Sequence, residues 1–371
     1  MDARQSLIEH LQEHFDVCAL GTEPGLAASF AKSGLRYRSY AMTRGVTPLK
    51  DLHAVVQLVR IFRVERPRVV HTFDTKPAVW GRFAAKIARV PVVIGTLPGL
   101  GSLYAEPGRK ARLARLAYQP LQTLACRWAD LTTFQNHDDE REFERRRVVR
   151  RGRSMVIPGS GVRTDVFAPL EREAVLRKRL ELGVGDAPVV VMVSRILRSK
   201  GVLDFTAAAR AVRASHPEIR FLLVGPDDRD SLDALTAAEL DELRDSVTWL
   251  GPRSDVREIL GLSDVFVFPS YYREGVPRVL LEAASMGLPL VAADVPGSRD
   301  VVADGVNGFL VPARDPGAIA EAVIRLAESQ DLRRDFGERS RERAVTQFAF
   351  TVVAERTELV YRELLAAKRI A

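Results

Sequence analysis

Short apolar runs alternate with longer amphipathic stretches along nearly the whole chain. The runs with strand character lie at 17–20, 69–72, 91–95, 131–134, 155–157, 189–194, 221–225, 247–251, 265–268, 290–293 and 308–311. The clearest helical patterns lie among them, at 4–13, 26–32, 49–65, 78–88, 171–182 and 350–367. Short strands that alternate with longer helices predict parallel sheets covered by helices on both faces. We therefore expect an α/β fold with doubly wound sheets.

The alternation is interrupted at 158–161, which reads P-G-S-G. Proline and small residues are typical of a loop between structural units, and a new series of strands and helices follows them. Two domains also suit a chain of 371 residues. We predict an N-terminal domain over 1–161, a C-terminal domain over 162–349 and a final helix within 350–371.

The two halves of the chain differ clearly in net charge. Residues 1–165 hold 27 Lys and Arg against 16 Asp and Glu, whereas residues 166–371 hold 28 against 32. A basic half suits nucleic acid, an anionic membrane surface or phosphorylated substrates, and charge alone does not choose among them. No apolar run approaches the roughly 18 residues of a membrane span, and the N-terminus lacks a signal-peptide core. With Cys18 and Cys126 occurring singly, we expect a cytoplasmic protein with reduced thiols.

The most informative stretch is 268–287, F-P-S-Y-Y-R-E-G-V-P-R-V-L-L-E-A-A-S-M-G. It reads as a strand end, a polar turn and a helix in which Pro277 suits the first turn. Glu274 and Glu282 are eight residues apart, which corresponds to a separation of about 12 Å along a helix that rises 1.5 Å per residue. That separation could span a sugar diphosphate. The plainer alternative is that Glu274 caps the helix and Glu282 is a solvated surface residue.

Two other strand ends carry residues suited to phosphates and nucleotides. S-R-I-L-R-S-K-G at 194–201 places Arg195 and Lys200 after a strand, and a helix follows the glycine. Arginine can hold a diphosphate through two hydrogen bonds, lysine acts as a compact charge, and a helix N-terminus adds oriented amides. The alternative is that both are surface charges. L-V-G-P-D-D at 223–228 ends a strand with a glycine that permits close backbone approach.

The stretch from Tyr272 to Gly297, Y-R-E-G-V-P-R-V-L-L-E-A-A-S-M-G-L-P-L-V-A-A-D-V-P-G, resembles the nucleotide-sugar site of retaining glycosyltransferases of family 4. The resemblance covers the second domain and the first from about residue 69. It implies the GT-B fold, two Rossmann-like domains facing across a cleft, with residues 350–371 packing back on the first. It also implies catalytic roles for Arg195, Lys200 and Glu274. The donor-binding residues that it implies are Ser194, Gly225, Pro226, Asp227, Gly275, Val276, Pro277, Arg278, Val279 and Glu282.

Two loops of the first domain resemble the acceptor side of family members that extend polyprenyl-diphosphate-linked glycans. They are V-V-H-T-F-D-T-K-P-A at 69–78 and G-T-L-P-G-L-G-S-L-Y at 95–104. The implied acceptor-side residues are His71, Thr72, Lys76, Gly99, Leu100 and Gly101. Taken alone, His71 is also consistent with a hydrogen-bonded structural histidine, and Asn136 with the start of a helix. The chain departs from many relatives at Pro98, where they carry a histidine.

The expected activity is transfer of a hexose or N-acetylhexosamine from a UDP-sugar to a lipid-linked or other glycan acceptor, with retention, in cell-surface polysaccharide synthesis. The co-substrate is the nucleotide sugar, and no motif suggests a metal or another cofactor. A nucleotide-sugar epimerase of the same fold and a catalytically impaired binding protein are the alternatives. Nucleic-acid binding is not expected, because the basic half lacks interleaved aromatic residues. We expect the protein in the cytoplasm or peripherally on the inner face of the membrane.

Two further hypotheses concern the N-terminal domain. The stretch 107–128 begins with Arg109, Lys110, Arg112 and Arg115, and it places Leu113, Leu116, Leu121, Leu124 and Trp128 along one side. Such a helix could lie against anionic lipid, or it could be an internal helix with a solvated basic start. The second hypothesis is that Met1 is an internal start, because the chain begins at a helix rather than at the apolar strand and glycine-rich loop with which family domains open.

Overall fold

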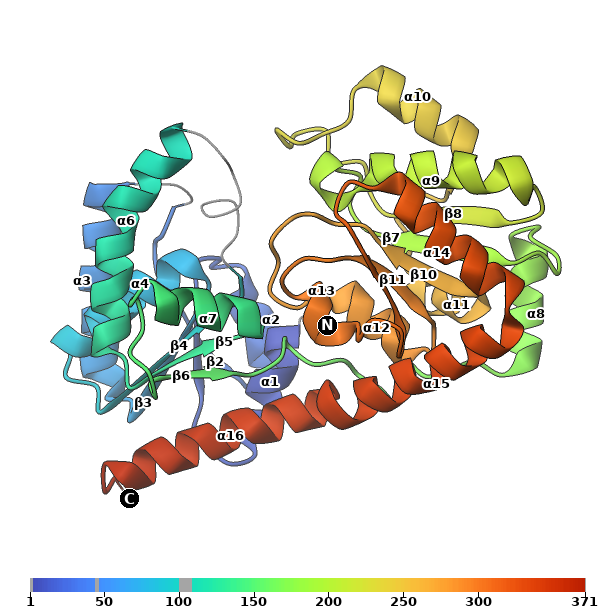
Figure 1. Cartoon of the computed structure of the whole chain (residues 1–371). Helices are drawn as coiled ribbons and strands as arrows, with labels where there is room; N and C mark the ends of the chain where they lie inside the picture. The colour runs from blue at the N-terminus through green and yellow to red at the C-terminus, as the bar shows by residue number, and fades with distance from the viewer. Residues whose placement is uncertain (1–2, 44–46, 100–108, 371) are drawn as a thin grey trace. The chain divides into compact units, whose positions relative to one another are not determined.

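The computed structural model describes residues 3–43, 47–99 and 109–370, except the side chains of residues 3, 4, 48 and 109–117. The chain divides into two compact units (Figure 1). The N-terminal unit comprises residues 1–160 and 351–371, and the C-terminal unit comprises residues 161–350. Among the described residues, no helix combines the length and apolar character that crossing a membrane requires.

The N-terminal unit contains two parallel sheets. Its strands are β1 (Cys18–Gly21), β2 (Arg36–Ser39), β3 (Val69–Phe73), β4 (Val92–Leu97), β5 (Leu131–Phe134) and β6 (Ser154–Val156). One sheet has the order β3-β4-β5-β6, and β1 and β2 form a separate pair. Its helices are α1 (Ala3–Gln12), α2 (Leu26–Lys32), α3 (Pro48–Glu65), α4 (Thr75–Ile87), α6 (Arg109–Trp128), α7 (His137–Arg145) and most of α16 (Phe350–Ala367). The hypothesis of an additional upstream strand stays a prediction.

The apolar pattern of the sequence did not predict β2. β2 reads R-Y-R-S and its residues are mostly exposed, so it lacks the apolar pattern by which the other strands were found. It forms because it pairs with β1 in parallel register, Cys18 opposite Arg36. Backbone pairing at the edge of a sheet needs no apolar side chains, which is why periodicity did not reveal it.

The terminal helix α16 packs on the N-terminal unit, as expected. Val353, Val360 and Tyr361 share an apolar cluster with Leu11 of α1 and with Ile94 of β4. Near the end of α16, the Lys368 ammonium lies 2.6 Å from a carboxylate oxygen of Asp130 and donates to the Pro91 carbonyl at 2.6 Å. The two cysteines form no disulfide, with Cys126 buried and Cys18 half-buried.

The C-terminal unit is built on one parallel sheet of six strands. These are β7 (Val189–Val193), β8 (Arg220–Val224), β9 (Thr248–Trp249), β10 (Val265–Phe268), β11 (Leu290–Ala293) and β12 (Gly308–Val311). The spatial order is β12-β11-β10-β7-β8-β9. The chain winds outward from β7 through β8 and β9, returns to β10 beside β7, and winds outward on the other side. The place where the direction reverses, between β7 and β10, is where doubly wound sheets bind ligands.

Helices cover both faces of this sheet (Figure 1). They are α8 (Arg172–Glu181), α9 (Val202–Ser215), α10 (Ala237–Ser246), α11 (Val256–Leu262), α12 (Arg278–Ser285), α13 (Ser298–Val301), α14 (Pro316–Glu328) and α15 (Gln330–Gln347), with a short 3-10 turn η1 (Arg198–Lys200). Along β7, Val189, Val191 and Val193 pack on the face with α11 and α12, while Val190 and Met192 pack on the face with α9 and α14. Because both faces are buried, the strand reads as an uninterrupted apolar run.

Candidate functional site

Two loops meet at the carboxyl ends of β7 and β10. The carbonyl of Ser199, in the loop after β7, accepts hydrogen bonds from the backbone N–H groups of Tyr271 at 3.1 Å and Tyr272 at 3.2 Å. The Ser270 hydroxyl donates to the same carbonyl at 3.3 Å. One carbonyl thus joins the two loops. Ser199 and Ser270 were not among the predicted site residues, and their only signal in the sequence is their place inside the two motifs.

This junction brings Lys200 and Glu274 together. The Lys200 ammonium contacts a carboxylate oxygen of Glu274, and the two side chains are 14% and 23% exposed. The Ser270 hydroxyl is 3.4 Å from that oxygen, and the ammonium lies 5.6 Å from the centre of the Tyr272 ring. A lysine and a glutamate separated by 74 positions are therefore side by side at the switch point of the sheet. Their partial burial strengthens the interaction relative to a pair in water.

Arg195 lies in the same loop as Lys200 but is more exposed. Its guanidinium donates to Asp228 at 2.8 Å, and its side chain is 57% exposed. Asp228 belongs to the loop after β8, where the neighbouring Asp227 carboxylate accepts from Arg229 at 2.5 Å. Ile196 N donates to the Pro226 carbonyl at 3.0 Å and holds the β7 and β8 loops together. The predicted residue Asp227 therefore stands beside the cationic loop.

Glu282 lies on α12 and is almost fully buried, with 8% of the residue exposed. Arg278, one turn earlier, donates to it at 2.9 Å. Burial raises the pKa of Glu282, and the charge and hydrogen bond of Arg278 partly oppose that rise. The alternative of a solvated surface glutamate is wrong for Glu282, because the helix turns this carboxylate inward. A buried carboxylate that keeps a polar partner is suited to accept hydrogen bonds from a ligand.

Two glycines allow these loops to approach one another closely. A Cβ on Gly225 would lie 1.7 Å from the Ser194 carbonyl oxygen, and Gly225 has φ +146°. A Cβ on Gly297, which has φ +86°, would lie 1.8 Å from the Gly275 carbonyl oxygen. Because any other residue would collide with backbone at these points, glycine determines how the β7, β8, β10 and β11 loops fit together.

The remaining donor-side residues line the same edge of the sheet. Ser194 continues the pairing beyond β7, with its N–H donating to the Val224 carbonyl at 2.9 Å. Pro277 precedes α12 as its N-cap residue, with φ −65° and ψ 119°. Val276 is buried and Val279 is partly buried, both against the core below α12. The structure therefore places the predicted donor residues in the three adjoining loops after β7, β8 and β10 and in the first turns of α12.

The predicted acceptor-side residues of the N-terminal unit are held by interactions within that unit. Both ring nitrogens of His71 are engaged, Nδ1 with the Tyr361 hydroxyl at 2.7 Å and Nε2 with the Thr96 hydroxyl at 2.6 Å. Burial lowers the pKa of His71 to about 3, so its imidazole is neutral. The Lys76 ammonium lies 2.6 Å from Asp51. Thr72 is buried and donates to the Ile94 carbonyl at 3.3 Å.

The other predictions for this unit have varied outcomes. Gly99 has φ +156°, whereas Leu100 and Gly101 lie outside the described residues. Asn136 begins α7 as predicted, since its side chain accepts from Asp139 N at 2.8 Å. The acceptor-side roles themselves stay predictions.

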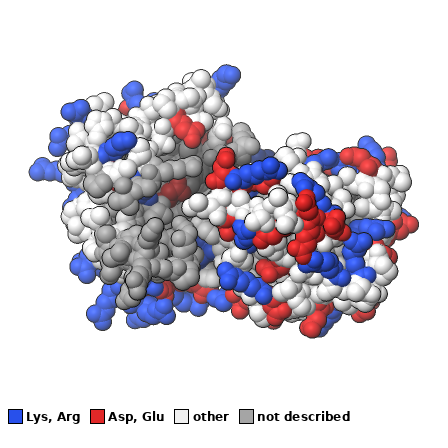
Figure 2. Space-filling view, turned by 90° about the horizontal axis from the view of Figure 1, so that it is seen from above, with Lys and Arg blue, Asp and Glu red and all other residues white. Residues whose placement is uncertain are grey.

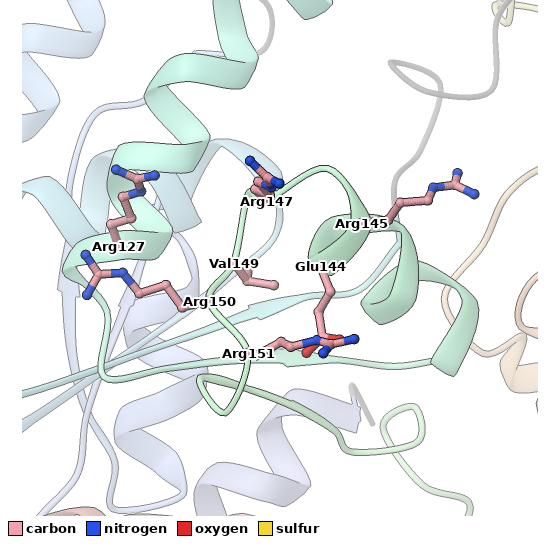
Figure 3. A pocket seen from close by; sticks show the side chains of 7 residues that line it. All are labelled: Arg127, Glu144, Arg145, Arg147, Val149, Arg150 and Arg151. Carbon is pink, nitrogen blue, oxygen red and sulfur yellow. The ribbon is translucent and has the colours of Figure 1, made fainter.

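A surface hollow of about 450 Å³ lies elsewhere on the N-terminal unit (Figure 3). Five arginines and Glu144 line it together with Val149, the arginines being Arg127, Arg145, Arg147, Arg150 and Arg151. It contains none of the predicted site residues. The arginines of the run at 141–153 are exposed, as expected of a solvated surface, whereas Glu142 and Glu144 are half-buried.

Two family models match the chain. The Glycosyl transferase 4-like domain covers residues 3–160, and Glycosyl transferases group 1 covers residues 177–343. The chain belongs to the family 4 glycosyltransferases. It is 29% identical to the UDP-Gal:alpha-D-GlcNAc-diphosphoundecaprenol alpha-1,3-galactosyltransferase of Escherichia coli. The aligned 325 residues cover 86% of this chain and 82% of that enzyme.

Other members of the family align over a similar length. The chain is 27% identical to the N,N'-diacetylbacillosaminyl-diphospho-undecaprenol alpha-1,3-N-acetylgalactosaminyltransferase of Campylobacter jejuni, over 90% of this chain and 87% of that one. Among solved structures, a glycosyltransferase of Rickettsia africae superposes with a TM-score of 0.81 at 17% identity, covering 98% and 94% of the two chains. HepE of Anabaena, in complex with UDP and glucose, superposes with a TM-score of 0.75 at 20% identity, covering 98% and 96%. The expected GT-B fold is confirmed.

Proposed function

We propose that this family 4 glycosyltransferase moves a hexose or an N-acetylhexosamine from a UDP-sugar to a glycan carried on a polyprenyl diphosphate, with retention of configuration. The observation that carries the proposal is the Lys200 and Glu274 pair at the switch point of the C-terminal sheet, with buried Glu282 on the adjoining helix. The Escherichia coli and Campylobacter jejuni relatives are named for acceptors of this class, which supports the choice of acceptor.

The cations in the β7 loop suit the leaving diphosphate. When the bond between the sugar's anomeric carbon and the diphosphate oxygen breaks, negative charge develops on that oxygen. Lys200 and Arg195 would stabilise this charge, as preorganised donors do in a partly dry site. The acceptor hydroxyl then forms the new bond to the anomeric carbon, and its proton passes to the diphosphate oxygen. No protein nucleophile is needed, so positioning and charge stabilisation account for catalysis.

The two glutamates would hold the ends of the donor. In the structure Lys200 contacts Glu274, and a bound diphosphate would compete for the ammonium and leave Glu274 able to accept hydrogen bonds from the sugar hydroxyls. Glu282 would accept from the ribose hydroxyls while Arg278 keeps its carboxylate oriented at 2.9 Å. The backbone amides at the N-terminus of α12, from Arg278 onward, would bind the phosphates.

Measurement of UDP release tests the proposal. The protein is incubated with UDP-sugars, with and without a polyprenyl-diphosphate-linked acceptor, and both nucleotides and glycans are analysed. We expect free UDP and an extended glycan only when donor and acceptor are both present. Arg210→Ala, which removes an exposed pair with Glu242 on the same unit, should retain this activity. Conversion of one UDP-sugar into another without acceptor would instead indicate an epimerase, and would refute the proposal.

We also propose that the enzyme works peripherally on the anionic inner face of the membrane that carries such acceptors. Figure 2 shows Lys and Arg gathered along the margin of the N-terminal unit, whereas both signs of charge are interspersed on the C-terminal unit. Figure 3 places Arg127 and Arg150 at one end of the arginine-lined hollow and Arg145 at the other. On α6, Leu124 is 39% exposed, while the rings of Trp128 and of Phe83 on α4 meet edge to face with their centres 4.9 Å apart.

Vesicle flotation tests this surface. We expect binding to vesicles that contain anionic lipid and loss of binding when Arg127, Arg147 and Arg150 are replaced by Gln. Replacing Arg172, Arg177 and Arg220, exposed on the C-terminal unit, removes the same charge and should leave binding unchanged. Equal loss in both variants would assign the effect to net charge, and binding that is independent of lipid charge would reject the surface.

A further inference from the structure

Two histidines and a glutamate from opposite ends of the chain converge within the N-terminal unit. His10 and His14 lie one turn apart, His10 within α1 and His14 just beyond its end, and Glu358 lies on α16. The Nε2 atom of each histidine is 3.3 Å from the same oxygen, Oε2 of Glu358. The two imidazole centres are 5.6 Å apart with an interplanar angle of 73°. The three possible ligand atoms all lie within 4.8 Å of one another.

The two distances from histidine to glutamate agree with those between ligands of one metal ion. Zinc binds imidazole nitrogen at about 2.0–2.1 Å and carboxylate oxygen at about 2.0–2.2 Å, which in a tetrahedron places neighbouring ligand atoms roughly 3.3 Å apart. Both histidine-to-glutamate distances have this value. The turn after α1 continues its winding, with His14 N donating to the Leu11 carbonyl at 3.2 Å. Residues four positions apart in such a turn are neighbours, so the two histidines can bind the same ion.

The surroundings of Glu358 favour this arrangement. Arg362 donates to its other oxygen, Oε1, at 2.7 Å, which leaves Oε2 directed at the histidines. A group that holds the second oxygen of a ligating carboxylate fixes its orientation, as outer partners do in metal sites. The side chains of His10 and Glu358 are 19% and 15% exposed, so few water molecules compete at these two atoms.

We propose that His10, His14 and Glu358 form a binding site for a divalent transition-metal ion, with Zn²⁺ the best match. Two imidazoles and one carboxylate suit Zn²⁺ better than Mg²⁺ or Ca²⁺, which prefer oxygen ligands. Three protein ligands leave the fourth tetrahedral position to water. The ion would join the end of α1 to α16, and so connect two segments that are far apart in the sequence. No metal motif is visible in the sequence because Glu358 follows the histidines by most of the chain's length.

The C-terminal unit offers a matched control for this site. His216 Nε2 lies 3.3 Å from Glu328 Oε1, the same distance as at the proposed site but with a single histidine. A histidine and carboxylate pair of this kind can form a hydrogen bond or an ion pair without any metal. His216→Ala therefore shows what loss of such a pair does by itself.

Calorimetric titration of Zn²⁺ into the full chain, after treatment with a chelator, tests the proposal. We expect one Zn²⁺ per chain, a higher melting temperature with Zn²⁺, and a Co²⁺ complex with the strong visible absorption of tetrahedral coordination. His14→Ala should weaken Zn²⁺ binding by at least tenfold, whereas His216→Ala should not. Loss of a residue that only orients a metal ligand already weakens metal binding by about tenfold or more, and His14 would be a ligand itself. His14 is the most exposed of the three, so its removal disturbs packing least.

His14→Gln keeps a hydrogen-bond donor towards Glu358 and carries the test if the alanine variant fails to fold. Absence of Zn²⁺ binding in the wild-type chain would overturn the proposal. So would equal Zn²⁺ affinity and equal Co²⁺ spectra in the wild-type and His14 variants, because either result would leave only a hydrogen-bonded link between the two helices.

Discussion

Replacing Gly297 by alanine tests whether close loop contact positions the donor site. Gly297 has φ +86°, and an added Cβ would lie 1.8 Å from the carbonyl oxygen of Gly275 and 3.3 Å from that of Glu274. Gly305 is the matched control, because it has φ +71° and no atom within 4 Å of an added Cβ. Both variants force alanine into a left-handed conformation, and only Gly297→Ala also collides with backbone.

The magnitudes follow from these two contributions. A left-handed conformation costs an L-residue roughly 1–2 kcal/mol, which is the whole cost expected for Gly305→Ala. Overpacking adds roughly 1–3 kcal/mol where a neighbour must move, so Gly297→Ala should cost about 2–5 kcal/mol. At about 2–4 °C for each kcal/mol in a unit of this size, Gly297→Ala should lower the melting temperature by roughly 2 to 12 °C more than Gly305→Ala.

The assay combines thermal unfolding with donor kinetics. Because the neighbour that must move is Gly275, beside Glu274, Gly297→Ala should raise the KM for the UDP-sugar, whereas Gly305→Ala should leave it unchanged. Equal melting temperatures in the two variants, together with an unchanged donor KM in Gly297→Ala, would refute the reasoning. The Gly275 loop would then be free to move without loss of stability or of donor binding.

Two other substitutions test the charged residues. Lys200→Ala should lower kcat more than it weakens donor binding, because the diphosphate charge develops only as the bond breaks. Steady-state kinetics measure this, with Arg210→Ala as the control variant. An unchanged kcat would contradict the prediction. Glu282→Gln should weaken donor binding and also change the pH dependence of stability. Burial raises the pKa of Glu282 above its ordinary value of 4.5, because it disfavours the charged carboxylate. The folded state therefore gains stability from the protonated carboxyl. This gain is fully present below pH 4.5 and is lost as the pH rises through the raised pKa. Since glutamine does not ionise, the variant should gain stability relative to wild type as the pH rises through that range; denaturant unfolding over a pH series measures this, and a pH-independent difference would contradict it.

Local pattern predicted the strands of the C-terminal unit and the final helix well. The expected strands at 265–268, 290–293 and 308–311 coincide with β10, β11 and β12, and the expected final helix coincides with α16. A strand buried on both faces must be apolar at every position, and a helix must bury a stripe of fixed period, so the signal lies in neighbouring residues. β2 escaped because its polar residues are exposed and only backbone pairing with β1 defines it.

The motifs around Lys200 and Glu274 were also visible locally, as a cationic loop after one strand and a glutamate before a helix. Their contact was not, because β8 and β9 come between β7 and β10 in the sequence. Only the order of strands in the sheet places β10 beside β7. The inward direction of Glu282 likewise depends on how α12 packs, which the spacing of the two glutamates alone does not determine.

By itself, the sequence determined most of the strands and helices, because burial imposes its period on consecutive residues. It also predicted a division into two domains and the loops that we propose carry the chemistry. Only the tertiary structure decided which of those loops meet. Partners such as Lys200 and Glu274, or His14 and Glu358, are chosen by strand order and helix packing, which depend on the whole of a unit at once. A contact between distant residues leaves no periodic pattern in either segment, so it can be read only once the chain has folded.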